Sequence, residues 1–541
     1  MKAFVRPVGR MLLIFLLVLT KALGAQRGPT QRPKLVLFIT IDAMRPDYLQ
    51  RFDAQLGGGL ARLYRDGAVF TNGFQDHAIT ETAPGHAATM SGRFPVHTGI
   101  VANTAGVNDS TTTLLESSAP GASPRRFRGT TLTDWLAAKD PRTRVLSVSR
   151  KDRAAILPVG SSKRPVYWYG GNGNFTTSTY YAAALPAWVR AFNSRQIPAS
   201  YAGKSWELLL PATSYAEPDS VPIESGGIGF TFPHRAPTTA DSTVRAFGEF
   251  PWMDSTTLAL ALEGVKTMNL GAGPQTDLLA ISLSTTDAVG HRYGPDSREI
   301  HDQILRLDKY LGAFFDSLFR MRKRNDVVIA LTADHGLTPY PEVHDHDPNV
   351  GAVRVDPGPL LEAVSKSLGA AGVRGNGYSF ISGVYRGNGF TFDAGVLQLD
   401  RAALVQARIN NDSLVLSIRN SFLKLPGVAR VNRVPELQKR DTVRDRIGRR
   451  WLHMFANEDQ AALLVTLSPY NYWVSSGYQA HHGSPNDPDA RVPIMFYGAG
   501  VKPGRYSEFA RVVDMAPTLA ALVGVRPLER LDGHVLRNAI R

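Results

Sequence analysis

The 541-residue chain is 43% hydrophobic and 20% charged, the composition of a globular protein rather than of a disordered one. Its 61 lysine and arginine residues exceed its 47 aspartate and glutamate residues, and the formal net charge of +14 suits nucleic acid, anionic lipid or an anionic small substrate. The absence of cysteine excludes disulfides, thiolate metal sites and a cysteine nucleophile, so any metal ion must be held by histidine, aspartate and glutamate.

The first 25 residues, MKAFVRPVGRMLLIFLLVLTKALGA, predict a cleaved signal peptide. They begin with basic residues, continue with an apolar run at 11–19 and end in small residues near Ala25, and the run is too short to span a bilayer. We therefore expect an exported protein, periplasmic or secreted, without stable membrane insertion after cleavage. An uncleaved anchor is the alternative.

Three apolar runs of strand length each end in polar residues and an aspartate: KLVLFITID (34–42), DLLAISLSTTD (277–287) and DVVIALTADHG (326–336). Continuous apolar runs are typical of strands buried on both faces of a parallel sheet. Between the last two, residues 300–321 space their apolar side chains at three and four positions, which predicts a crossover helix packed on that sheet. The fold class expected is α/β, with a largely parallel central sheet, helices on both faces and inserted cap regions.

Two long regions lack this pattern. Residues 160–255 are rich in Gly, Pro, Tyr, Trp and Ser, and residues 340–475 mix strand-like runs such as GVLQLD with loops. Long irregular stretches in a compact enzyme are usually functional, so we expect cap insertions in a single catalytic domain over 26–541. An independent second domain is the alternative. The aromatic stretch PVYWYGGNGNFTTSTYY (165–181) either lines a leaving-group pocket or forms the core of the cap.

The segment ETAPGHAATMSG (81–92) raises the question of why a lone hydroxyl, Thr82, stands before an Ala-Pro-Gly-His turn. Either Thr82 is an incidental loop residue or it is a nucleophile at the start of a helix. A helix opened by the following residues would direct its N-terminal N–H groups and its dipole at a bound phosphate.

Aspartate and histidine residues recur where the predicted strands end. They are Asp42 after the first run, Asp287 and His291 in TTDAVGH, Asp334 and His335 in ADHG, and His481 and His482 in AHHGSP. Each alone has a structural explanation, as a helix cap or a surface histidine. In open α/β sheets, however, ligands bind beyond the carboxyl ends of the strands, where Asp42, Asp287 and Asp334 are expected.

Carboxylate and imidazole suit Zn²⁺, and this many ligands is enough for two ions about 3.5–4 Å apart, which stabilise in-line displacement at phosphorus. Metal coordination would also activate the Thr82 hydroxyl.

These segments resemble the alkaline phosphatase superfamily, in particular its phosphate-irrepressible alkaline phosphatases and the related nucleotide pyrophosphatase/phosphodiesterases. The resemblance rests on ITIDAMRPDYL, ETAPGHAATMSGRFPVHTGIVAN, STTDAVGHRYGP, TADHG and HHGSPNDPDARVPIMFYG, which occur in the family's order and span nearly the whole mature chain. It implies an alkaline-phosphatase-like fold and hydrolysis of phosphate monoesters through a phosphothreonine at a site with two Zn²⁺ per chain.

The resemblance also implies roles for individual residues. One zinc ion would be bound by Asp42, Thr82, Asp334 and His335, and the other by Asp287, His291 and His482. His482 is preferred to His481 because it directly precedes Gly483-Ser484, where the family motif lies. Asn103 stands where the family places an amide that donates to a phosphoryl oxygen.

A further pair, Lys151 and Arg153 in SVSRKDRAAI (147–156), bears on the substrate. Two positions apart on an extended segment, they would point the same way and reach one phosphate, or they are two solvated surface charges. The extra charged oxygen of a monoester favours such cations, and the resemblance places a Lys-x-Arg pair in the monoesterases but not in the nucleotide diesterases.

Two alternatives to the monoesterase remain open: a phosphodiesterase on the same scaffold and, in another class, an inactive exported binding protein. A sulfatase is disfavoured because its nucleophile derives from cysteine or serine, and a phosphomutase would need a route for returning the phosphoryl group. The basic residues form only short clusters, such as RMRKR (320–324) and RDRIGRR (444–450), which we interpret as solvated helix faces or loops. We expect a monomer without nucleic acid as a dedicated partner, because no recognition motif accompanies the positive charge.

Overall fold

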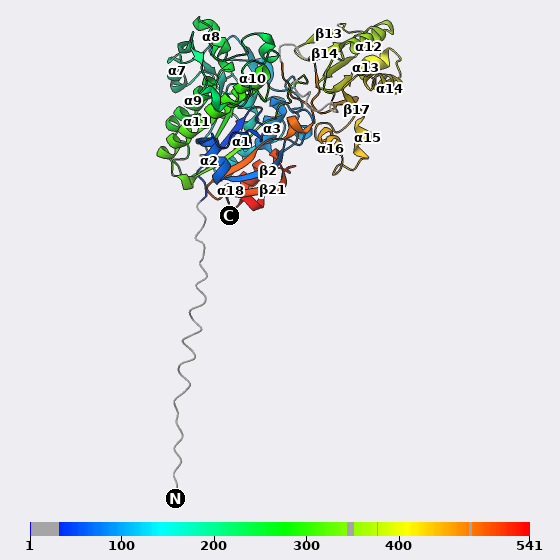
Figure 1. The fold of residues 1–541 in the computed structure, drawn as a ribbon. Helices are drawn as coiled ribbons and strands as arrows, with labels where there is room; N and C mark the ends of the chain where they lie inside the picture. The colour runs from blue at the N-terminus through cyan, green and yellow to red at the C-terminus, as the bar shows by residue number, and fades with distance from the viewer. Residues whose placement is uncertain (2–31, 343–350, 376, 475–478) are drawn as a thin grey trace.

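The computed structural model describes residues 1, 32–342, 351–375, 377–474 and 479–541, which are arranged as Figure 1 shows. Apart from Met1, the signal peptide expected at residues 1–25 lies outside the described residues. Among the helices that are described, none has both the length and the apolar character needed to cross a lipid bilayer.

Nine of the described strands form one central sheet. In order across the sheet they are β21 (Gly504–Arg511), β2 (Ala68–Phe74), β20 (Ile494–Gly498), β11 (Val327–Thr332), β1 (Leu35–Ile41), β10 (Asp277–Leu283), β5 (Val145–Ser149), β6 (Val166–Tyr169) and β7 (Phe175–Thr176). The five strands from β11 to β6 are parallel, whereas β20 and β7 run antiparallel to their neighbours. The three strands predicted from apolar runs are β1, β10 and β11, which are adjacent and fully buried. The largely parallel sheet is therefore confirmed.

Helices cover both faces of the sheet. On β5, Leu146 lies against Gly264 of α9, while the neighbouring Ser147 donates its hydroxyl hydrogen to the Ala155 carbonyl of α6 on the other face. The first layer contains α2 (Gly59–Asp66), α9 (Trp252–Thr267) and α11 (Arg298–Met321), and the second contains α3 (Thr82–Ser91), α5 (Leu132–Lys139), α6 (Asp152–Ile156) and α18 (Met515–Val523). Helix α11 confirms the amphipathic helix predicted over 300–321, and its buried positions keep the spacing of three and four.

The first irregular region, residues 160–255, is continuous with the main core. It contributes β6 and β7 to the central sheet and adds α7 (Ala187–Asn193) and α8 (Ala240–Ala246). Trp168, Phe175, Trp206 and Phe247 of this region are buried in the same apolar cluster as the central strands. The region is thus a wall built directly onto the sheet, above the end of β5.

Within the second irregular region, residues 340–475, a six-stranded antiparallel sheet has its own core. Its strands in order are β13 (Ser379–Ile381), β14 (Val384–Gly387), β15 (Phe390–Asp393), β16 (Val396–Leu399), β18 (Leu463–Leu467) and β17 (Val428–Asn432). Helices α12 (Gly358–Ala370) and α14 (Asn411–Phe422) pack on it, and their apolar side chains join a cluster distinct from the main core. Figure 1 shows this part as a lobe at the upper right of the main body.

Buried ion pairs fasten this lobe to the loop that leads into α3. Asp76, just after β2, is 1% exposed and accepts hydrogen bonds at 2.9 Å from Nε and Nη2 of Arg449 in α16 (Arg446–Leu452). Arg450 is fully buried and donates to Asp487 Oδ1 at 2.8 Å. Our expectation of a solvated face for the cluster 444–450 is therefore wrong for Arg449 and Arg450, because both guanidinium groups are turned inward toward carboxylates.

Candidate active site

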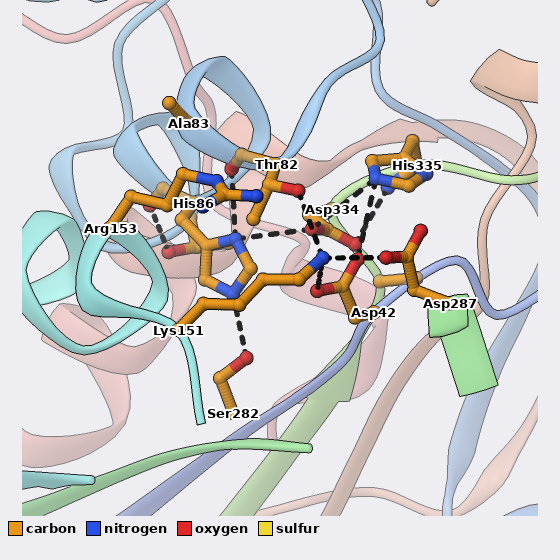
Figure 2. A network of polar contacts seen from close by, with 12 residues as sticks. Asp42, Thr82, Ala83, His86, Lys151, Arg153, Ser282, Asp287, Asp334 and His335 are labelled. Carbon is orange, nitrogen blue, oxygen red and sulfur yellow. Dashed lines mark hydrogen bonds and ion pairs between the residues drawn. The ribbon is translucent and has the colours of Figure 1, made fainter. Parts of the chain in front are cut away.

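Three aspartates meet at the carboxyl edge of the central sheet. Asp42 directly follows β1, Asp334 follows β11 after one residue, and Asp287 lies in the first turn of α10 (Thr285–Tyr293), just after β10. Because these strands are parallel neighbours, their ends bring together side chains from distant parts of the sequence (Figure 2). All three carboxylates are buried, with at most 5% of the side-chain surface exposed.

Lys151 lies between two of these carboxylates. Its Nζ is 2.6 Å from both Asp42 Oδ2 and Asp287 Oδ2, and it donates to Thr82 Oγ1 at 3.4 Å. Burial and the charge of Asp287 raise the pKa of Asp42, but Lys151 and His335 outweigh them and hold that pKa below its usual value. Burial likewise raises the pKa of Asp287, and Lys151 followed by His291 and His482 lowers it further than burial raises it. Both carboxylates are therefore charged at neutral pH.

Three histidines are oriented identically by the backbone. Nδ1 of His291, His335 and His482 bonds to the carbonyls of Ala480, Gly336 and Thr80, each at 2.8 Å. A carbonyl only accepts, so Nδ1 carries a ring proton in all three residues and Nε2 faces the carboxylates. Nε2 of His291 is 3.2 Å and Nε2 of His482 is 3.6 Å from Asp287 Oδ1, and Nε2 of His335 is 3.4 Å from Asp42 Oδ1.

His335 and His482 stack, with ring centroids 3.6 Å apart. Burial lowers the pKa of His335, but the charges of Asp334, Asp42 and Asp287 raise it to about 9. Burial and the neighbouring His335 instead lower the pKa of His482 well below its usual value. Only one of the two rings carries a proton charge, as expected for cations in contact.

His481 differs from its neighbour. Its Nδ1 accepts the backbone N–H of His482 at 2.8 Å, which places its ring proton on Nε2. Burial lowers the pKa of His481 to about 3, so the ring is neutral, and its Nδ1 is engaged by the main chain. This hydrogen bond gives a physical reason for preferring His482.

Several buried atoms of the cluster have no hydrogen-bond partner. They are Asp42 Oδ1 and Oδ2, Asp287 Oδ1, Asp334 Oδ2 and His335 Nε2, although Asp42 Oδ2 is ion-paired with Lys151 and Asp334 Oδ2 lies close to His86. Unsatisfied buried carboxylate oxygens are unusual in folded proteins, and a bound cation accounts for them. Ligand atoms within 4.8 Å of one another form three trios: Asp42, Asp334 and His335; Asp287, His335 and His482; and His291, His481 and His482. These oxygen and nitrogen donors fit a metal ion such as Zn²⁺.

Thr82 is the first residue of α3, after the extended N-cap residue Glu81, so its hydroxyl stands at the start of a helix. The helix approaches the sheet edge closely at Gly85, where a Cβ atom would lie 2.2 Å from the Asp334 carbonyl oxygen. His86, one residue further, places Nδ1 2.9 Å from the Thr82 carbonyl and 3.2 Å from Asp334 Oδ2. Helix α3 and β11 are thus fixed relative to each other beside the Thr82 hydroxyl.

Asn103 is held against the start of α3. Its backbone N–H donates to Glu81 Oε2 at 2.7 Å, and its Oδ1 accepts the Ala83 N–H at 2.9 Å. With Oδ1 engaged, the Nδ2 amine is the group that Asn103 can offer to a ligand in the pocket that it lines. Burial and the nearby Asp393 raise the pKa of Glu81 to about 7.

Lys151 and Arg153 are not on an extended segment, contrary to our expectation. Strand β5 ends at Ser149, Lys151 is the N-cap of α6, and Arg153 lies inside that helix. Both residues nevertheless line the pocket that contains Thr82, and Figure 2 shows Arg153 extending toward it. The Nε atom of Arg153 is buried without a hydrogen-bond partner. The shared direction therefore comes from the turn into α6, not from strand alternation.

The pocket has a volume of about 770 Å³ and opens from Thr82 toward the first irregular region. Trp168 and Tyr169 line it, and Trp168 is also 3% exposed and part of the main core. The two interpretations of the stretch 165–181 are thus both correct in part.

Glu81 and His86 also belong to this site, although no sequence pattern marked them within ETAPGH (81–86). A glutamate before a threonine predicts a helix cap at most, and a helical histidine is usually a core residue. Ser282, which bonds to His86 Nε2 at 2.8 Å, lies in the predicted strand 277–287 and left no signal of its own.

Comparisons with known proteins agree with this geometry. A family model described as "Type I phosphodiesterase / nucleotide pyrophosphatase" matches residues 36–371. Alkaline phosphatase PhoV of Synechococcus elongatus is 32% identical over 534 residues, covering 94% of this chain and 93% of PhoV. Alkaline phosphatase PafA of Elizabethkingia meningoseptica is 29% identical, covering 95% of this chain and 96% of PafA.

The crystal structure of PafA matches this structure with a TM-score of 0.82 and 27% identity, over 94% of this chain and 99% of that one. A solved PafA variant, in which one threonine, one asparagine, one lysine and one arginine are substituted, matches with the same TM-score and 26% identity. The alkaline-phosphatase-like fold class is thereby confirmed.

Substituting Gly85 by alanine should disrupt the cluster. The added Cβ would clash with backbone and side-chain atoms of Asp334, so α3 or the end of β11 must move. We expect Gly85→Ala to weaken zinc binding about 10–100-fold, as disturbing the surroundings of a metal ligand does. Titration calorimetry with Zn²⁺ measures this, with Gly57→Ala as control because no atom lies within 4 Å of its added Cβ. Equal zinc affinity of the two variants would contradict the close approach.

Proposed function

Because the chain belongs to the type I phosphodiesterase/nucleotide pyrophosphatase family, we propose that it is an alkaline phosphatase that hydrolyses phosphate monoesters through a phosphothreonine on Thr82 at a two-zinc site. Family membership confirms the resemblance found in the sequence, and the relatives named alkaline phosphatase, which cover nearly the whole chain, confirm that it is an enzyme. The observation that carries the proposal is the position of Thr82, whose hydroxyl lies 3.4 Å from Lys151 Nζ beside the buried carboxylates.

Seven residues would hold the metal ions. Asp42, Thr82, Asp334 and His335 would bind one Zn²⁺, and Asp287, His291 and His482 the other; the unsatisfied oxygens and the Nε2 orientation support metal binding by these residues. When bound, zinc lowers the pKa of a coordinated hydroxyl and offsets negative charge on phosphoryl oxygens.

The chain's own residues then bring about two displacements. Thr82 Oγ releases its proton to solvent and forms a bond to phosphorus while the bond to the ester oxygen breaks, and the departing oxygen takes a proton from solvent. Water then forms the new bond to phosphorus as the bond to Thr82 Oγ breaks, and the proton that this water loses restores the Thr82 hydroxyl as phosphate is released. The Nδ2 amine of Asn103, whose Oδ1 is held by the Ala83 N–H, would face the phosphoryl oxygens throughout.

Lys151 and Arg153 favour a monoester over a diester. A monoester dianion presents a further charged oxygen, which an ammonium and a guanidinium bind and which a diester replaces with a neutral group. The substituted threonine and asparagine of the PafA variant are 21 positions apart, like Thr82 and Asn103, and its lysine and arginine are two apart, like Lys151 and Arg153. A phosphodiesterase, which the family description also names, stays the second candidate. An inactive binding protein is disfavoured because the nucleophile and all expected ligands lie together.

We place this activity outside the cytoplasm, in the periplasm or the medium, because the first 25 residues have the pattern of a signal peptide. The protein would act as a monomer on small phosphate monoesters, without nucleic acid as a dedicated partner.

Removing metal should abolish hydrolysis. After dialysis against a chelator, we expect no turnover of an aryl phosphate, and two Zn²⁺ per chain should restore it, as measured by elemental analysis and initial rates. His482→Ala should lose zinc and activity, whereas the adjacent His481→Ala should keep a stoichiometry of two, because only His482 directs Nε2 at the carboxylates. Full activity without metal would refute the two-zinc site.

Thr82→Ala should lower kcat by about 10⁴-fold, the scale of removing a covalent nucleophile. Thr82→Ser, which keeps a hydroxyl, should retain much of the rate. With a chiral phosphate ester, two successive displacements predict retention of configuration at phosphorus. Net inversion would mean that water attacks directly and that Thr82 is only a ligand.

The double substitution Lys151→Ala, Arg153→Ala should lower kcat/KM for an aryl phosphate by about 10²–10⁴-fold, because each charge-assisted contact contributes about 1.5–3 kcal/mol. Hydrolysis of the methyl diester should change much less. Lys139→Ala, Arg142→Ala removes the same charges from the exposed surface and serves as control. Equal losses of kcat/KM on both esters would contradict this role and favour the phosphodiesterase instead. Zinc content is measured in each variant, so that loss of metal is not mistaken for loss of substrate binding.

A further inference from the structure

The pocket is larger than a phosphoryl group requires. Its volume of about 770 Å³ falls in the range that accommodates drug-sized molecules. Thr82 and Asn103 lie at its inner end, and Tyr169, Arg245 and Gly248 belong to its outer wall. This outer wall faces whatever group is attached to the ester oxygen, so its chemistry selects among monoesters.

Three arginines line the outer wall around residues 245–249. Arg150 lies directly against Gly248, where a Cβ atom would be 2.2 Å from the Arg150 Nε. Arg292 approaches the next residue, with Nη1 3.6 Å from Glu249 Oε2. Arg245 belongs to α8, which leads into this segment, and all three arginines line the pocket.

The wall that carries them is fixed. The Tyr169 N–H donates to the Arg150 carbonyl at 3.3 Å, and the Tyr169 hydroxyl donates to the Val244 carbonyl at 2.6 Å. These bonds tie the end of β5 to α8 and therefore hold Arg150 and Arg245 on one side of the pocket. Glycine at 248 leaves the space that the Arg150 guanidinium fills, since any side chain there would displace it.

These charges are only partly balanced. Within the described parts of the chain, no carboxylate forms an ion pair with Arg150 or Arg245; Arg245 Nη2 donates only to Ser242 Oγ, at 3.3 Å. Arg292 shares one carboxylate, Glu249, and donates from Nε to Ser225 Oγ at 2.7 Å. Like charges held together on one wall repel one another, and an anion bound between them relieves this repulsion.

We propose that the outer pocket is a second anion-binding subsite, made by Arg150, Arg245 and Arg292, and that the preferred substrates are small phosphate monoesters whose leaving group carries a second phosphate. This inference rests on the proposed function, because the first phosphate occupies the Thr82 end. Guanidinium groups suit a tetrahedral dianion, since each can donate two parallel hydrogen bonds to its oxygens. The second phosphate is bound and not cleaved, so the reaction at Thr82 is unchanged.

Alkanediol phosphates of increasing spacer length test the subsite. For each spacer, kcat/KM is measured for the bisphosphate and for the monophosphate, corrected for the statistical factor of two equal phosphates. We expect the corrected kcat/KM of the bisphosphate to exceed that of the monophosphate at least about tenfold at one spacer length. This ratio should fall at high salt, because the three guanidinium groups are partly solvated. In Arg150→Gln, Arg245→Gln this preference should disappear, while monophosphate kcat/KM stays within about threefold.

The control is Arg320→Gln, Arg324→Gln, which removes two exposed charges before the start of β11, at the opposite edge of the sheet, and should keep the preference. A corrected ratio near one for every spacer, or a preference that survives in Arg150→Gln, Arg245→Gln, overturns the proposal.

Binding separates this inference from the proposed function. Calorimetry with zinc-loaded Thr82→Ala protein should show the bisphosphate binding at least about tenfold more tightly than the monophosphate, and the added Arg150 and Arg245 substitutions should remove the difference. If monoester hydrolysis fails but this preference is present, the subsite stands and the proposed chemistry falls. Equal affinities of bisphosphate and monophosphate refute the subsite even if hydrolysis is confirmed.

Discussion

The mutual repulsion of three buried carboxylates is the constraint on which this structure depends. Asp42, Asp287 and Asp334 come together because the parallel strands before them end at one edge of the sheet. Like charges a few ångströms apart in a medium of low polarity cost several kcal/mol unless cations compensate them. Lys151 supplies one positive charge and a protonated His335 a second, and unsatisfied oxygens still remain. A hydroxyl at this edge of the sheet is therefore surrounded by carboxylates that bind cations.

Backbone groups fix the geometry of these side chains. The carbonyls of Gly336, Ala480 and Thr80 set the histidine tautomers, and the Ala43 N–H donates to Asp334 Oδ1 at 3.2 Å. Ala43 adopts a left-handed conformation with φ of 58°, which is unfavourable for alanine and is tolerated because its neighbours hold it in place. Rigid contacts of this kind keep ligand atoms oriented even before a metal ion binds, so less reorganisation accompanies binding.

The sequence predicted those features that depend on local patterns. Runs such as 34–42 identify buried strands because a sheet covered on both faces needs continuous apolar residues, and α11 followed from its amphipathic spacing.

The geometry of Lys151 and Arg153 was mispredicted, since nothing local marks where β5 ends and α6 begins. Glu81 and His86 gained importance only through partners far away in sequence, such as Ser282, and the burial of Arg449 depends on Asp76. The preference for His482 over His481 came from the order of the motif. Its physical basis is the hydrogen bond from the His482 N–H to His481 Nδ1, which only the three-dimensional structure shows.

The position of β2 in the central sheet has a consequence for the order of folding during synthesis. Both neighbours of β2 in the sheet, β20 and β21, come from the last part of the chain, although β2 itself lies near the beginning. A nascent chain therefore cannot pair this strand until almost all of it has left the ribosome, and closing so long a loop is slow. Helix α3 follows β2 closely and packs on α18, which also comes from the last part of the chain, so its surroundings are complete only when that part has been made. A partly synthesised chain therefore lacks both the pairing of β2 and part of the packing that holds Thr82 in place.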